Sequence, residues 1–205
     1  MNFKATLAAF ALAFASTLHA AETTGPEEAI KAKTAQVLSD LSAHQTQADA
    51  NTDAGLARLK GTLKDVLTPI MDVDAAAKLL LGQRWRDATE DQQNRFKDAL
   101  GAMLLSTYTD TLASAGSITI DVMDAKPSSR ADRSSVPARA TLESGRTLEF
   151  VYRMRKHGDD WKIYDIKVDG ISMLRTYRSS VQAAVERDGL QAVIETLEER
   201  YGIQS

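Results

Sequence analysis

Residues 161–180 read WKIYDIKVDGISMLRTYRSS, and the rest of the chain is organised around this stretch. Its first half has the apolar content of a buried strand. Asp169 and Gly170 then form a turn signal, and Ser172 can cap a helix that follows. The stretch therefore predicts a strand that turns sharply into an amphipathic helix.

The apolar side chains of this strand change face part-way along it. Trp161 and Ile163 share one parity, whereas Ile166 and Val168 have the other. Either both faces of the strand are covered, or a β-bulge near residues 164–165 resets the register. We favour the bulge, because strong curvature would let the sheet wrap around something.

Upstream of the strand, apolar residues recur at helical spacing, and short breaks divide them into separate helices. Residues 89–92 match a capping box at the start of the longest one. Two more helices follow the strand. The predicted helices span residues 26–48, 53–68, 75–81, 89–116, 172–187 and 190–201.

From Ser117 the apolar period changes from helical to two, which predicts strands. Pro137 is expected on the outer face of an edge strand, where proline is tolerated. Short links indicate an antiparallel meander. The chain is therefore predicted to be an α+β domain, with a curved four-stranded antiparallel sheet and helices packed on one face. The residues that converge between helices and sheet fit either a packed core or an apolar pocket.

Residues 1–20 have the features of a secretory signal peptide. Lys4 precedes an apolar run over residues 5–18, and the segment ends in Leu-His-Ala, so cleavage is expected after Ala20. The mature part, residues 21–205, is predicted to be a single domain. Its apolar stretches are too short to cross a bilayer.

Charge and cysteine content narrow the class of protein further. Removing Lys4 would change the net charge from −3 to −4, and the chain has no basic block, which argues against nucleic acid as a partner. It has no cysteine, hence no disulfide and no site for a lipid anchor on a cysteine. These features predict a protein of the Gram-negative periplasm.

Signals for catalysis are weak. His44, on a polar helix face, and His157, in a hairpin turn, do not have metal-ligand spacing, and nucleotide or nucleophile motifs are absent. We therefore expect no metal, no cofactor and no enzyme. The alternative is a small isomerase or hydratase on a curved sheet, with Tyr108, Tyr164 and Asp165 in a pocket. Asp165 could instead face solvent or cap the bulge.

Two sequence strings resemble a known family. The first is LGQRWRDATEDQQNRFKDALGAMLLSTYTDTL (residues 81–112), and the second is the opening stretch. The chain resembles the MlaC-type periplasmic phospholipid-binding proteins, the toluene-tolerance auxiliary components of an ABC transport system. The matching residues are Gly82, Trp85, Arg86, Ala88, Thr89, Gln92, Arg95, Phe96, Thr107, Tyr108, Leu112, Trp161, Lys162, Tyr164, Asp165, Gly170, Ser172, Tyr177, Arg178 and Ser179.

The resemblance implies a monomeric lipid carrier whose pocket opens between sheet and helices. It implies that phospholipid moves between an outer-membrane lipoprotein–porin complex and an inner-membrane ABC transporter complex with a substrate-binding ring. This movement would maintain outer-membrane lipid asymmetry. A hopanoid-associated paralogue is the alternative. Arg86 and Arg178 are candidates for the head group or a partner. The expected lipid-binding residues are Trp85, Phe96, Met103, Leu104, Tyr108, Val136, Phe150, Tyr152, Met154, Ile163, Val168, Met173, Leu174 and Tyr177.

Overall fold

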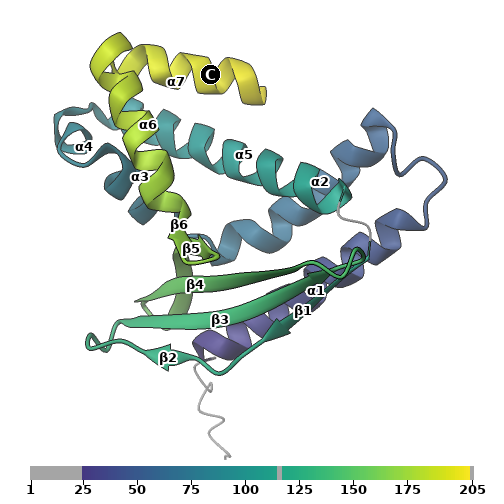
Figure 1. Cartoon of the computed structure of the whole chain (residues 1–205). Coiled ribbons are helices and arrows are strands. Elements are labelled where there is room, and N and C mark those ends of the chain that lie inside the picture. Colours follow the sequence, from purple (N-terminus) through teal and green to yellow (C-terminus); the bar gives the residue numbers. More distant parts are fainter. Residues whose placement is uncertain (1–24, 115–116, 204–205) are drawn as a thin grey trace, which may run out of the picture.

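The computed structural model describes residues 25–114 and 117–203, and it consists of a helical layer above one face of a curved sheet (Figure 1). The predicted signal peptide, residues 1–20, lies outside the described residues, as does the predicted end of the long helix at Gly116. No helix in the described part of the chain is long and apolar enough to span a membrane.

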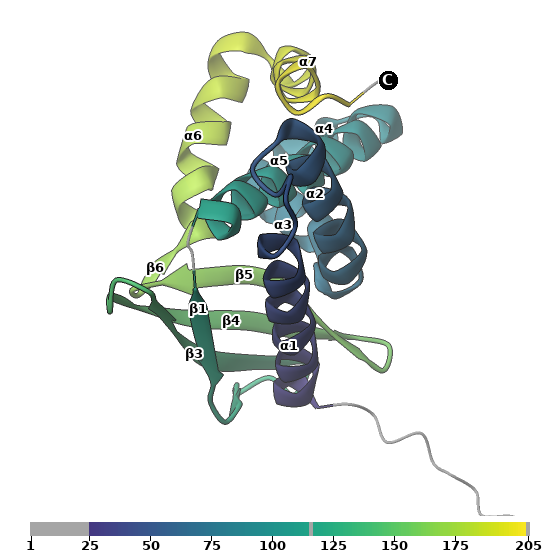
Figure 2. The same cartoon turned by 90° about the vertical axis from the view of Figure 1, so that its right-hand side faces the viewer.

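The helices follow the predicted order. They are α1 (Pro26–Gln45), α2 (Asp53–Leu67), the short 3₁₀ helix η1 (Thr68–Ile70), α3 (Val73–Leu81), α4 (Arg84–Asp87), α5 (Glu90–Ser114), α6 (Met173–Asp188) and α7 (Leu190–Tyr201). All six predicted helices are present. Helix α4 was not predicted, because four residues are too few to establish a helical period. Helix α1 packs against α2 and lies along β1 and β3, so it flanks the space between the layers (Figure 2).

The sheet is antiparallel, with the strand order β1–β3–β4–β5–β6 and a short β2 paired to β3. The strands are β1 (Ile118–Val122), β2 (Lys126–Pro127), β3 (Arg133–Leu142), β4 (Thr147–His157), β5 (Asp160–Val168) and β6 (Ile171–Ser172). The α+β prediction is confirmed, as are its four strands. Two further strands, β2 and β6, were not predicted because each is only two residues long.

The predicted bulge is present in β5. Arg153 pairs with Asp165, whereas the next residue of β4, Met154, pairs with Ile163. Tyr164 is therefore the extra residue, and the register shift explains why the apolar residues change parity along β5.

The prediction that Pro137 lies in an edge strand is wrong, because β3 is an internal strand. Pro137 lies opposite the break between β1, which ends at Val122, and β2, which begins at Lys126. Its carbonyl still accepts a hydrogen bond of 2.9 Å from the amide of Met123. Proline has no amide hydrogen to donate, and at this break no strand residue requires one.

Side-chain caps fix where the helices begin. The predicted capping box is confirmed, since the side chains of Thr89 and Gln92 each accept a bond of 3.2 Å from the other residue's amide. Asp72 caps α3 by accepting from the amide of Ala75 at 2.9 Å. Ser172 caps α6 as predicted, accepting from the amide of Arg175 at 3.1 Å. The start of α6 is thus fixed directly beside the sheet edge.

The sequence pattern placed His44 on a polar helix face. This prediction is wrong, because the side chain is buried, with 6% exposure.

Candidate functional site

A cavity of about 490 Å³ lies between the sheet and the helices. It forms where three packed apolar clusters meet: one among α3, α5, α6 and α7, one between α1 and α2, and one where α1 and η1 contact β3 and β4. Each cluster contributes residues to the wall. The lining residues are Ile30, Lys33, Thr34, Val37, Leu67, Ile70, Met71, Asp72, Val73, Ala76, Leu80, Leu100, Leu104, Tyr108, Thr111, Leu112, Ile118, Ile120, Ala140, Leu142, Leu148, Phe150, Tyr152, Ile163, Tyr164, Asp165, Ile166, Met173, Leu174 and Tyr177.

The floor of the cavity is the apolar face of the sheet. Ile120, Ala140 and Leu148 are register partners on three adjacent strands, so their side chains lie side by side. Next along β4, the rings of Phe150 and Tyr152 stack, with centroids 6.5 Å apart. The small side chain of Ala140 in the central strand leaves room above the sheet that a larger residue would fill.

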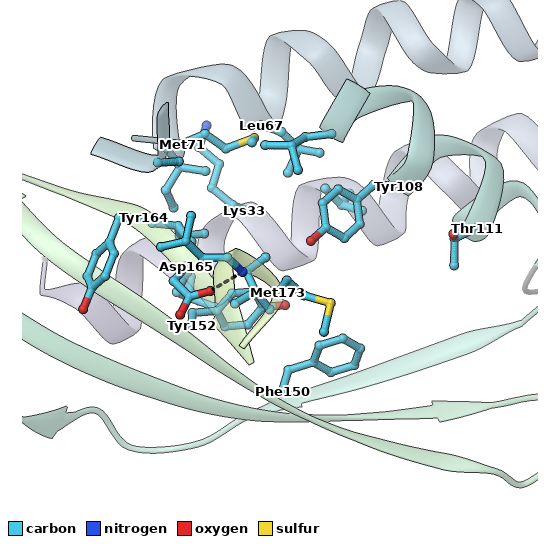
Figure 3. Close-up of a pocket in the computed structure, with 18 of the residues that line it drawn as sticks. Lys33, Leu67, Met71, Tyr108, Thr111, Phe150, Tyr152, Tyr164, Asp165 and Met173 are labelled. Atoms are coloured by element: carbon cyan, nitrogen blue, oxygen red, sulfur yellow. Dashed lines mark hydrogen bonds between the residues drawn. The ribbon is translucent and has the colours of Figure 1, made fainter. Parts of the chain in front are cut away.

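The roof is one stripe of the long helix α5. Leu100, Leu104, Tyr108 and Leu112 recur every fourth residue and all line the cavity. The same stripe begins at Phe96, which is fully buried in the helical cluster instead. In Figure 3, Tyr108 reaches from α5 toward Phe150 of the sheet and Met173 at the start of α6.

Two phenol groups in the wall stay neutral at physiological pH. Burial, with smaller contributions from the nearby Tyr177, Tyr152 and Asp165, raises the pKa of Tyr108 to about 12. Burial alone raises the pKa of Tyr152 to about 12. Because both hydroxyls keep their protons, they add polar contacts to the wall without adding charge.

Two of the charged lining residues are already engaged by the protein. Asp72 is buried, caps α3 and forms an ion pair with Arg155 of β4. The side chain of Asp165 is fully buried. Lys33 of α1 also lines the cavity. Because Asp72 and Asp165 are both engaged by the protein, neither carboxylate presents a free negative charge to the cavity.

Asp165 ties the bulge of β5 to the start of α6. One carboxylate oxygen accepts from the amide of Leu174 at 3.0 Å, the bond drawn in Figure 3. The other accepts from the Ser172 hydroxyl at 2.8 Å and from Nη1 of Arg153 at 3.1 Å. Of the two placements considered from sequence, solvent exposure is wrong, and the carboxylate lies at the bulge.

The three residues of the isomerase or hydratase alternative, Tyr108, Tyr164 and Asp165, do not point toward one shared position in the cavity. Tyr164 points away from the cavity centre in Figure 3, and its ring lies against the guanidinium groups of Arg133 at 4.8 Å and Arg153 at 5.0 Å. Both oxygens of Asp165 already accept hydrogen bonds from the protein. The described residues also contain no group of three or more His, Cys, Asp or Glu side chains that could hold a metal ion.

The structure brings eight of the fourteen predicted lipid-binding residues to the cavity wall: Leu104, Tyr108, Phe150, Tyr152, Ile163, Met173, Leu174 and Tyr177. It places the other six elsewhere. Phe96, Val136 and Met154 are fully buried in the packed clusters, and Trp85 and Met103 pack against the helical cluster. Val168 pairs with Phe150 but does not line the cavity.

Sequence reasoning missed much of the lining. Ile120, Leu142 and Leu148 share the parity of the predicted apolar sheet face, so strand alternation could have identified them. By contrast, Lys33 and Thr34 lie at polar positions of α1, and no apolar pattern in the sequence points to them.

The two candidate arginines lie at different places. Arg86 is exposed on α4 and lines no part of the cavity. Arg178, on α6, lines a second groove outside the cavity. Its side chain lies beside Gly82, which ends α3.

The sequence and the fold are similar to those of known proteins. A model of the MlaC protein family matches residues 31–199. The toluene tolerance protein ttg2D of Pseudomonas putida is 28% identical over 167 residues, which cover 80% of this chain and 74% of that protein. The intermembrane phospholipid transport system binding protein MlaC of Haemophilus influenzae is 20% identical over 192 residues, covering 91% and 87%.

A solved structure has the same fold. The phospholipid-binding protein from Ralstonia solanacearum, in complex with a phospholipid, superposes with a TM-score of 0.72 at 20% identity, covering 86% of this chain and 96% of that one. The family model spans α1 to α7 and includes most of the residues that form the cavity. This chain therefore belongs to the MlaC protein family.

Proposed function

We propose that this chain is a periplasmic carrier that holds the acyl chains of a phospholipid in the cavity between sheet and helices. The observation that carries the proposal is the cavity itself, a largely apolar space of about 490 Å³ in which the phenols of Tyr108 and Tyr152 are neutral and the carboxylates are engaged. The phospholipid bound by the Ralstonia protein of the same fold supports it.

The free energy of burying acyl chains fits a protein that both takes up and releases lipid. Each buried methylene gains about 0.8 kcal/mol relative to water, so two chains of roughly sixteen carbons gain on the order of 25 kcal/mol. A bilayer offers nearly the same gain. Transfer between membrane and cavity is then close to isoenergetic, and its direction must be set by partners.

The partners and the location are part of the same proposal. The name of the Haemophilus relative supports a place in an intermembrane phospholipid transport system. We infer export by a signal peptide of residues 1–20, followed by one monomeric domain of residues 21–205. That domain would exchange lipid with an inner-membrane ABC transporter complex and an outer-membrane lipoprotein–porin complex, and so maintain outer-membrane lipid asymmetry.

Within the site, we assign contact with the acyl chains to the aromatic and aliphatic wall. Phe150 and Tyr152 provide the floor, Leu104 and Tyr108 the roof, and Met173 the end beside α6. The six predicted residues that lie outside the wall hold the surrounding structure in place. This assignment describes a carrier and requires no catalytic group.

A cavity-filling variant tests the proposal. Ala140 is 1% exposed and lines the floor, so the indole of an Ala140→Trp variant would occupy space that we assign to lipid. The matched control is Thr119→Trp, an exposed position on the neighbouring strand β1. Both proteins are incubated with phospholipid vesicles, re-isolated, checked for folding by circular dichroism and analysed for bound lipid.

The two variants should differ in lipid content but not in fold. We expect the Thr119→Trp protein to carry lipid as the natural chain does, and the folded Ala140→Trp protein to lose most of it. Equal lipid loading in two folded variants would contradict the assignment of the cavity as the lipid site.

A further inference from the structure

A second groove, of about 440 Å³, lies where the end of α3, the start of α6 and the edge of the sheet meet. It is lined by Leu79, Arg153, Lys167, Gly170, Ser172, Leu174, Arg175 and Arg178. Four of these eight residues are cationic and none is acidic. The chain as a whole has a net charge of −3, so this concentration of positive charge is local.

Most of this positive charge is not neutralised within the protein. Arg153 donates to Asp165 and also lies against the ring of Tyr164. Lys167, Arg175 and Arg178, by contrast, form no ion pair with any residue in the described parts of the chain. Three unpaired cations that face one groove repel each other, and a bound anion would relieve that repulsion.

The groove and the cavity share one wall. Among the described residues, Leu174 alone lines both spaces. Its amide is held by Asp165, so the backbone at this position is fixed. A molecule with an apolar tail on one side of Leu174 and an anionic head on the other side would match the chemistry of both spaces.

We propose that this groove binds the phosphate of an anionic phospholipid whose acyl chains lie in the cavity. The inference rests on the proposed function, because it assigns the head group of the same cargo. The guanidinium groups of Arg175 and Arg178 can each donate two hydrogen bonds to phosphate oxygens, and Lys167 adds a point charge. Leu79, which is 40% exposed, offers an apolar surface to the glycerol backbone.

The charge of the groove also selects among head groups. A zwitterionic head group brings a cationic amine close to its phosphate, and the four cations repel that amine. A head group with a net negative charge, such as phosphatidylglycerol, has no such amine. The groove therefore favours phosphatidylglycerol over phosphatidylcholine. Arg86 has no part in this selection, because it lies outside the groove.

A competition experiment tests the assignment. Delipidated protein is incubated with vesicles of equimolar dioleoyl-phosphatidylglycerol and dioleoyl-phosphatidylcholine, and native mass spectrometry gives the ratio of the two lipids bound. We expect the natural chain to prefer phosphatidylglycerol by about tenfold, and the Arg175→Gln/Arg178→Gln variant to lose that preference. The control Arg84→Gln/Arg146→Gln makes the same charge change outside the groove and should keep the natural ratio.

Each other outcome has a distinct meaning. A double variant that keeps the natural ratio, or a natural chain without preference, would overturn the groove assignment while leaving the carrier proposal intact. A natural chain that binds neither lipid would instead overturn the carrier proposal.

Titration calorimetry with inorganic phosphate separates lipid from free phosphate as the source of the anion. With protein already loaded with phosphatidylcholine, we expect no measurable binding, because the phosphate of the bound lipid occupies the groove. Phosphate binding that disappears in the Arg175→Gln/Arg178→Gln variant would make this a site for free phosphate and refute the lipid assignment.

Discussion

Replacing Asp165 with alanine should destabilise the protein by about 3 kcal/mol. The side chain is fully buried and accepts bonds from Arg153, Ser172 and the amide of Leu174. Removing one member of a buried ion pair typically costs 3–5 kcal/mol. The side chain of Arg153 is 39% exposed and can regain water, so the lower end of that range applies.

Urea unfolding followed by tryptophan fluorescence and circular dichroism measures this loss. Asp159→Ala is the matched control, because Asp159 is exposed in the turn before β5, and it should stay within about 0.5 kcal/mol of the natural chain. Asp165→Asn should lie between the two. Its amide oxygen can still accept from Leu174, but its NH₂ group would face the guanidinium of Arg153.

The same variants report on function. Asp165 fixes the start of α6, where Met173 and Leu174 line the cavity, so Asp165→Ala should also retain less lipid. A loss of stability below about 1 kcal/mol in the alanine variant would refute the reasoning that this carboxylate anchors α6.

Three further predictions concern other parts of the fold. Glu198→Ala should lower the Tm by about 5 °C, because it removes both bonds, of 2.6 and 2.8 Å, that Arg95 of α5 makes to α7; an unchanged calorimetric Tm would contradict this. Raised folded-state pKa values mean that Tyr108 and Tyr152 stabilise the fold below pH 10, and that about 2–3 kcal/mol for each is lost as the pH rises from 10 to 12. Urea unfolding across that range should show the loss, and the two Tyr→Phe variants should lack it. Gly82→Ala should cost about 1–2 kcal/mol, since φ is +59° there and the new methyl group would meet a guanidinium nitrogen at 3.2 Å; a neutral effect in urea would argue against this close approach.

Local patterns predicted the parts of the fold that depend on local chemistry. The change of apolar parity along β5 placed the bulge near residues 164–165, where the structure has it at Tyr164, because alternation is a direct consequence of strand geometry. The pair Thr89 and Gln92 placed the start of α5, because a capping box satisfies backbone donors within four residues.

The parts that depend on distant neighbours could not be predicted. Pro137 fits an internal strand only because β1 and β2 are separate strands, and no pattern around it indicates that gap. Phe96 and Tyr108 belong to one stripe of α5, yet one is in the packed core and the other lines the cavity. Periodicity identifies the apolar face of a helix but not whether another side chain or empty space lies opposite.

Native mass spectrometry of the protein, purified without detergent, tests the central claim most directly. A carrier that holds acyl chains in this cavity predicts phospholipid adducts that persist under native conditions and disappear on denaturation. A single apo mass that remains apo after incubation with phospholipid vesicles would contradict the claim.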